Sequence, residues 1–182
     1  MTGRMGRTRA IALGVLLVLA GLIQVVVLSP VDWPGAVPDL LVPIVVGVAL
    51  GAGPMAGALA GFTAGAVLDI APPAGHPLGQ WAFVLGVLGY AAALFVDENA
   101  GILRGVLLSA AVGALAPVLF NLLGHLFSDP RAGVVFAIER APAAAAWSAL
   151  LAFGFLPGTR LLVRGPGRTR ADKFGIPVGV GM

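Results

Sequence analysis

The sequence predicts an all-α integral membrane protein, folded as a compact bundle of six transmembrane helices. Hydrophobic residues make up 59% of the 182 residues and charged residues only 10%, too few polar groups to cover a water-soluble globule of this size. Six apolar runs approach the length of about 20 residues that a membrane-spanning helix needs. Stretches such as 11–18 and 141–146 are apolar without the alternation of a membrane β-strand, so we expect helices.

The six apolar runs are separated by short connectors, and we therefore expect one transmembrane domain, residues 10–157. A basic cytoplasmic tail, residues 1–9, precedes it, and a basic tail expected to be disordered, residues 158–182, follows it. The first run is longer than the apolar region of a signal peptide, which predicts a retained helix. In chain order the runs are 10–28, 39–52, 54–70, 78–96, 102–127 and 133–157.

The number of spans depends on residues 39–70, which form either two short helices or one long kinked helix. Six spans bring both tails to one side of the membrane and leave only two basic residues, Arg131 and Arg140, on the opposite side. The positive-inside rule then favours six spans with both termini cytoplasmic. The basic residues collected on that side are Arg4, Arg7, Arg9, Arg104, Arg160, Arg164, Arg168, Arg170 and Lys173.

A glycine recurs at every fourth position of the third run and is followed by an aspartate at the same spacing. Four residues turn a helix by about 400°, so these glycines form a stripe without side chains along one side. Such a stripe lets another helix approach closely in lipid. We favour packing within the bundle over docking of another protein's helix, and both remain open. The stripe consists of Gly53, Gly57, Gly61 and Gly65.

Two aspartates stand at expected helix ends. Asp39 is suited to cap the second helix, because its carboxylate can accept hydrogen bonds from the free amide groups there and its charge suits the helix dipole. Asp69, at the end of the glycine stripe, has two possible roles. It is either an ordinary residue of the membrane interface or an acceptor for amide groups at the start of a neighbouring helix.

The polar residues gather toward the outer ends of the helices, while the inner half is almost purely apolar. This asymmetry argues against a proton relay or ion pathway and indicates an outward-facing site or interface. For Arg140 two alternatives remain: pairing with Asp39 or Asp69, or extension to the lipid headgroups. The outer polar cluster, as we name it, consists of His76, Asn121, His125, Glu139 and Arg140.

The sequence offers no recognisable chemistry. The absence of cysteine excludes disulfides and cysteine-ligated metals, and two distant histidines make no zinc motif. No serine stands in a Gly-x-Ser-x-Gly turn, and no acidic ladder of a metal-dependent transferase is present. We therefore expect that the protein is not an enzyme and that it has no catalytic residue, metal or cofactor. The basic tails are explained by topology and anionic lipid, not by nucleic acid.

Five short motifs follow one another along the chain: Pro38-Asp39-Leu40, Gly53-Pro54, Gly61-Phe62 with Gly65 and Asp69, Pro77-Leu78-Gly79 and Gly89-Tyr90. In this order they resemble the MreD family of rod shape-determining proteins, and the resemblance extends over roughly residues 10–127. The resemblance implies a non-enzymatic scaffold of the bacterial cytoplasmic membrane. It further implies binding to MreC, and through it an indirect link to MreB filaments, RodA and penicillin-binding protein 2 in peptidoglycan synthesis.

A second hypothesis follows from architecture. MreD-like proteins are similar to the S components of energy-coupling-factor vitamin transporters, which have six helices and an outward-facing ligand site. This similarity implies a small-molecule uptake module as the alternative function. The outer polar cluster fits either a ligand or the outer portion of MreC. The sixth helix and the C-terminal tail match no feature of the family.

Overall fold

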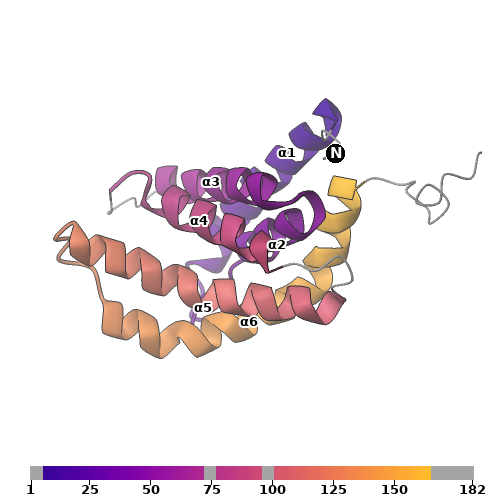
Figure 1. The fold of residues 1–182 in the computed structure, drawn as a ribbon. Coiled ribbons are helices and arrows are strands. Elements are labelled where there is room, and N and C mark those ends of the chain that lie inside the picture. Colours follow the sequence, from indigo (N-terminus) through magenta and orange to yellow (C-terminus); the bar gives the residue numbers. More distant parts are fainter. Residues whose placement is uncertain (1–5, 72–76, 96–100, 165–182) are drawn as a thin grey trace, which may run out of the picture.

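A computed structural model describes residues 6–71, 77–95 and 101–164 of the chain. Every regular element in these ranges is a helix, which confirms the predicted all-α class (Figure 1). The π-helical turn η1 directly continues the first helix. The elements are α1 (Arg7–Ile23), η1 (Gln24–Leu28), α2 (Leu41–Ala52), α3 (Pro54–Ile70), α4 (Gln80–Leu94), α5 (Ile102–Leu126) and α6 (Val134–Arg164).

Three of the helical segments are long and apolar enough to cross a membrane: Arg7–Leu28, Ile102–Leu126 and Val134–Val163. The other three helices are apolar but shorter, with 12 residues in α2, 17 in α3 and 15 in α4. At about 1.5 Å per residue, α2 measures roughly 18 Å, less than the hydrocarbon layer of about 30 Å. The apolar helices agree with a membrane protein, while six spans remain a prediction.

The helices form two hairpins around a central helix. Helices α3 and α4 pair closely, and α5 pairs with α6 below them in Figure 1. Helix α2 lies between the hairpins and contacts each of the other helices. The start of α1 and the end of α6 lie at the same end of the molecule as the turn between α2 and α3 (Figure 1). Six spans with both termini on one side require this arrangement.

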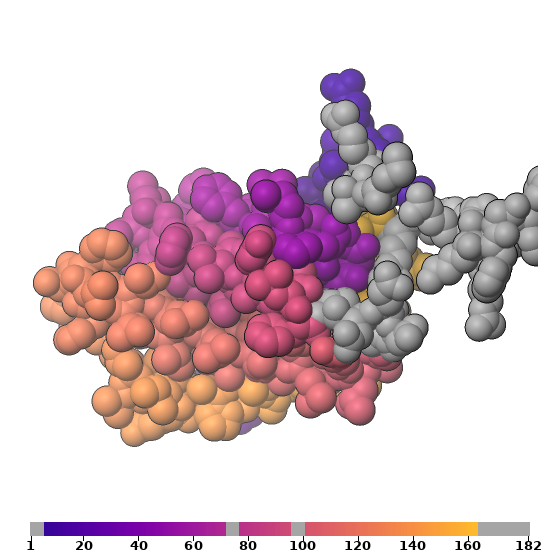
Figure 2. Space-filling view, in the orientation of Figure 1, coloured from indigo at the N-terminus to yellow at the C-terminus, as the bar shows by residue number. Residues whose placement is uncertain are grey.

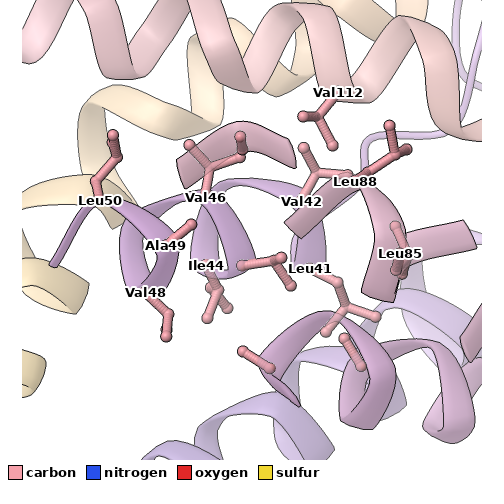
Figure 3. Packing of buried hydrophobic residues seen from close by; sticks show 14 of the residues in the cluster. Leu41, Val42, Ile44, Val46, Val48, Ala49, Leu50, Leu85, Leu88 and Val112 are labelled. Atoms are coloured by element: carbon pink, nitrogen blue, oxygen red, sulfur yellow. The ribbon is translucent and has the colours of Figure 1, made fainter. Parts of the chain in front are cut away.

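The core of the bundle is built around α2. All of its residues from Leu41 to Leu50 are buried, because this stretch is apolar on every side and other helices surround it. Its side chains meet Leu85 and Leu88 of α4 and Val112 of α5 (Figure 3). The shortest helix therefore organises the interior, and the hairpins separate most of it from the surrounding lipid.

The outward faces of the hairpins are apolar as well. Figure 2 shows α3, α4, α5 and α6 following one another across one face of the molecule. Large apolar side chains are exposed on these helices, as expected for surfaces in contact with lipid instead of water. They include Leu59 and Phe62 of α3, Phe83 and Val87 of α4, Leu107 and Leu115 of α5, and Leu150 and Phe153 of α6.

Helix α6 is longer than the sequence predicts. The expected transmembrane domain ends at residue 157, before a disordered tail, but α6 continues through Pro157 and Gly158 to Arg164. The continuation is packed against α2: Thr159 fills the space beside Gly47, and Val163 lies beside Gly51. Tertiary contacts thus stabilise helix where the local Pro-Gly signal predicts an end.

Candidate functional site

Three glycines of the predicted stripe bring α3 directly against α4. All three are buried, and a Cβ atom at any of them would overlap the backbone of α4. The approach is mutual at one position, because a Cβ atom on Gly89 would overlap the carbonyl group of Gly57. Close packing of this kind replaces the hydrophobic drive that is missing in lipid. The facing pairs are Gly57 with Gly89, Gly61 with Leu85, and Gly65 with Trp81.

Gly53 does not belong to this packed stripe, contrary to the sequence-based expectation. It lies between α2 and α3 with a φ of +91°, and a Cβ atom built on it would meet nothing within 4 Å. A positive φ is readily adopted by glycine, so Gly53 is a turn residue. Pro54 then begins α3 at a position where the missing amide hydrogen costs no helical hydrogen bond.

Asp69 joins the end of α3 to the start of α4. Its side chain is only 2% exposed. Its Oδ1 accepts a 3.0 Å hydrogen bond from the backbone N–H of Trp81, and its Oδ2 accepts a 3.0 Å bond from the N–H of Ala82. The residue preceding α4 is Gly79, which has no side chain to cap the helix. Asp69 therefore supplies, from another helix, the acceptors and the negative charge that a helix start favours.

The connection into α2 is held by two polar side chains. Oδ1 of Asp39 accepts hydrogen bonds from the N–H groups of Leu41 at 2.9 Å and Val42 at 3.2 Å, the geometry of an N-terminal cap. Gln24, in the π-helical turn, accepts a 2.9 Å hydrogen bond from the N–H of Leu40 through its Oε1. The chain leaving α1 is thereby tied to the start of α2.

Asn121 organises the outer end of the α5–α6 hairpin. Its Oδ1 accepts a 2.9 Å hydrogen bond from the N–H of Gly133, just before α6. Its Nδ2 donates a 2.8 Å hydrogen bond to the carbonyl of Pro117, one turn earlier in α5. One amide side chain thus bridges α5 and the residue from which α6 begins, and fixes the separation of the two helix ends.

An open cavity of about 720 Å³ lies between these two helix ends, and we call it the outer hollow. It brings together His125 of α5 and Glu139 of α6, two members of the outer polar cluster, within a mainly apolar wall. The sequence did not single out its apolar residues, because an exposed leucine or phenylalanine in a span looks like any lipid-facing residue. The lining consists of Leu122, His125, Ala132, Gly133, Val134, Val135, Phe136 and Glu139.

Arg140 is exposed, and its guanidinium carbon lies 4.1 Å from the centre of the Phe136 ring. Of the two alternatives for Arg140, pairing with Asp39 or Asp69 is not found: Arg140 makes this cation–π contact, and both carboxylates accept hydrogen bonds from backbone amides. Among the expected cluster members, Asn121, His125, Glu139 and Arg140 therefore gather at one hairpin end. His76 lies outside the described residues.

Two aromatic pairs place Trp81 and Trp33 in packing contacts, although tryptophans near a membrane interface can also serve as anchors. Trp81 of α4 stacks on Phe120 of α5 at 4.2 Å, and the neighbouring Gln80 donates a 2.6 Å hydrogen bond to the Phe120 carbonyl. Trp33, in the connection after α1, packs edge-on against Trp147 of α6 at 5.4 Å. Aromatic residues can serve either role, and only the fold distinguishes packing from anchoring.

A comparison with protein-family models supports the resemblance over more of the chain than the short motifs cover. Residues 5–165 match the family model for the rod shape-determining protein MreD, a range that includes all the described helices and also α6, which the motifs did not cover. No curated protein and no solved structure matches the chain. Because the match extends over nearly the whole chain, the protein belongs to the MreD family of rod shape-determining proteins.

Proposed function

We propose that this protein is a membrane scaffold of the rod-shape machinery that acts by binding MreC. Membership of the MreD family implies a role in rod shape determination, and this is a family of structural proteins not known as enzymes. Family membership is the observation that carries the proposal. On this view the protein contributes contacts and geometry to cell-wall elongation, and other proteins perform the chemistry.

The packing of α3 against α4 limits where a partner can bind. Gly57, Gly61 and Gly65 are occupied by the backbone of α4, so no partner helix reaches them without separating the hairpin. The stripe serves the internal fold, and the binding surface for MreC lies elsewhere. The outer ends of the helices, where polar side chains gather, are the surface we assign to MreC.

A scaffold must hold its contact surfaces in fixed positions, and the outer ends of the helices are tied in three places. Asp69 binds the start of α4, Gln24 binds the residue before α2, and Asn121 binds the residue before α6. Each of these hydrogen bonds joins one helical element to the start of the next helix in the chain. Preorganisation of this kind lowers the cost of ordering a surface when a partner binds.

The remaining features of the proposal follow the sequence and the family. We place the protein in the bacterial cytoplasmic membrane, with six spans and both termini in the cytoplasm. Through MreC it reaches MreB, RodA and penicillin-binding protein 2 indirectly. Anionic lipid contacts the basic tails on the cytoplasmic side.

The alternative is a vitamin-uptake module similar to energy-coupling-factor S components. The outer hollow gives it little support: its volume is about 720 Å³, but it is open to the surroundings, whereas small-molecule sites enclose most of the ligand. Against it stands the centre of the bundle, which the buried side chains of α2 fill. We therefore rank the scaffold first.

Detergent co-purification tests the proposal. The full chain, tagged and expressed in its host, is extracted in mild detergent and isolated together with its bound proteins and small molecules. The proposal expects MreC in the isolated complex, and less of it with the Gly61→Leu variant, whose hairpin is disrupted. Retention of a vitamin without MreC would favour the alternative.

A further inference from the structure

We propose that the outer hollow receives the outer, membrane-proximal segment of a protein partner. That segment inserts an apolar side chain and places an adjacent lysine or arginine against Glu139. The inference deepens the proposed function and rests on it for the identity of the partner as MreC. It assigns the contact to one hairpin end, formed by the end of α5 and the start of α6.

The walls of the hollow are suited to an apolar anchor. Leu122 is 43% exposed, Phe136 is 56% exposed and Val135 is 70% exposed, and all three line the same cavity. Protein interfaces gain most of their affinity from a few large side chains that fill such cavities at the centre of the contact. An inserted apolar side chain would cover these three residues together.

The charged residues of the hollow indicate which kind of partner side chain lies beside the inserted apolar one. Glu139 lines the hollow and, among the described residues, has no hydrogen bond or ion pair. The neighbouring Arg140 forms no ion pair with Glu139, and its guanidinium lies over the ring of Phe136 instead. Glu139 is exposed, so its carboxylate is accessible to a cation of a partner, and His125, which lines the same hollow, offers a further hydrogen-bonding group.

A protein side chain fits these charges better than a lipid does. The ammonium group of a zwitterionic phospholipid is always joined to a phosphate, which the carboxylate of Glu139 repels. A lysine or arginine brings a positive charge without an adjoining anion, on a stem that can follow an apolar wall. Charge complementarity therefore favours a basic side chain of a partner protein over lipid.

The hollow is formed before any partner arrives. Asn121 binds the N–H of Gly133, a lining residue, and so sets the distance between the two helix ends. Such a preformed recess needs little rearrangement on binding.

Photocrosslinking locates the partner. A benzophenone-bearing phenylalanine replaces Phe136 in the hollow or, as a matched control, Phe83 on α4, which are 56% and 59% exposed. Irradiation of host membranes is expected to join position 136, and not position 83, to MreC. Adducts at position 136 only with lipid, or only with a second copy of this chain, would overturn the inference.

Charge reversal tests the role of Glu139. In the full chain, Glu139→Arg is expected to reduce co-purified MreC by about tenfold or more, with Glu139→Gln between it and the unchanged protein. Asp32→Arg, at an exposed acid in the connection between α1 and α2 and outside the hollow, is the control and is expected to reduce MreC binding far less than Glu139→Arg. The melting temperature of both variants should match that of the unchanged protein.

The outcomes separate the two proposals. If the unchanged protein retains MreC, and Glu139→Arg retains it equally without a crosslink from position 136, the hollow is not the contact although the scaffold proposal stands. If the unchanged protein does not retain MreC at all, the proposed function fails and this inference fails with it. A tenfold loss with Glu139→Arg and an unchanged melting temperature supports both.

Discussion

Gly61 of α3 and Leu85 of α4 meet with no side chain between their backbones. A Cβ atom on Gly61 would overlap the carbonyl group of Leu85, and a carbonyl held in a helix has no free rotation by which to move away. The whole α4 helix would have to shift. This contact makes the α3–α4 hairpin intolerant of any side chain at the centre of the stripe.

We predict that Gly61→Leu destabilises the fold by about 3 kcal/mol or more, because overpacking against backbone finds no flexible group to displace. Thermal unfolding of the purified protein in detergent measures the loss. Gly154→Leu is the matched control, since a Cβ atom at Gly154 of α6 meets nothing within 4 Å, and its effect should stay within about 0.5 kcal/mol. An unchanged melting temperature for Gly61→Leu would refute the close approach.

Asp69 offers a second test on the same hairpin. Asp69→Ala removes both acceptors from the N–H groups of Trp81 and Ala82 and should cost about 2 kcal/mol or more. Asp69→Asn keeps one acceptor oxygen and should cost about 1 kcal/mol, the usual range for weakening a helix cap. Thermal unfolding compares the two, with Asp32→Asn as control. Equal stability of the alanine and asparagine variants would contradict the double hydrogen bond.

The end of α6 is tested by truncation. A chain that stops after Pro157 loses Thr159 and Val163, which are buried against Gly47 and Gly51 of α2. It should be destabilised by about 2 kcal/mol or more, since the removed side chains leave empty space beside α2. A chain that stops after Arg164 keeps these contacts and serves as control. Equal thermal stability of the two truncated chains would show that the last turns of α6 contribute nothing.

The absence of cysteine allows the topology to be tested with single substitutions. Pro130→Cys lies in the exposed connection between α5 and α6, and Thr8→Cys lies at the exposed start of α1. With six spans, a membrane-impermeant maleimide should label position 130 in intact cells and position 8 only after the membrane is opened. Labelling of both positions from outside would contradict the proposed topology.

Much of the fold follows from local signals in the sequence. Apart from the end of α6, the apolar runs predict the bounds of the described helices to within a few residues, because a chain in lipid must satisfy its backbone hydrogen bonds within each helix. The short motifs around Asp39 and Gly61 predict the MreD family, which the match over residues 5–165 confirms. Neither result depends on how the helices pack.

The boundaries that the sequence misjudged are those where local and tertiary signals conflict. Pro157 and Gly158 predict a helix end, yet contacts with α2 continue α6 to Arg164. Gly53 continues the fourfold spacing of the stripe, yet its positive φ places it in a turn. Spacing along the chain does not reveal whether a helix has already begun or whether another helix lies beside its end.

The sequence by itself determined the class of the protein, the positions of its helices and its family, since these depend on composition and on patterns within one segment. Only the tertiary structure decided that the glycines face α4, that Asp69 caps that helix, and that His125 and Glu139 share one hollow. These relationships join residues from different helices. Their physical reason is the packing of one backbone against another, which no single segment of the sequence contains.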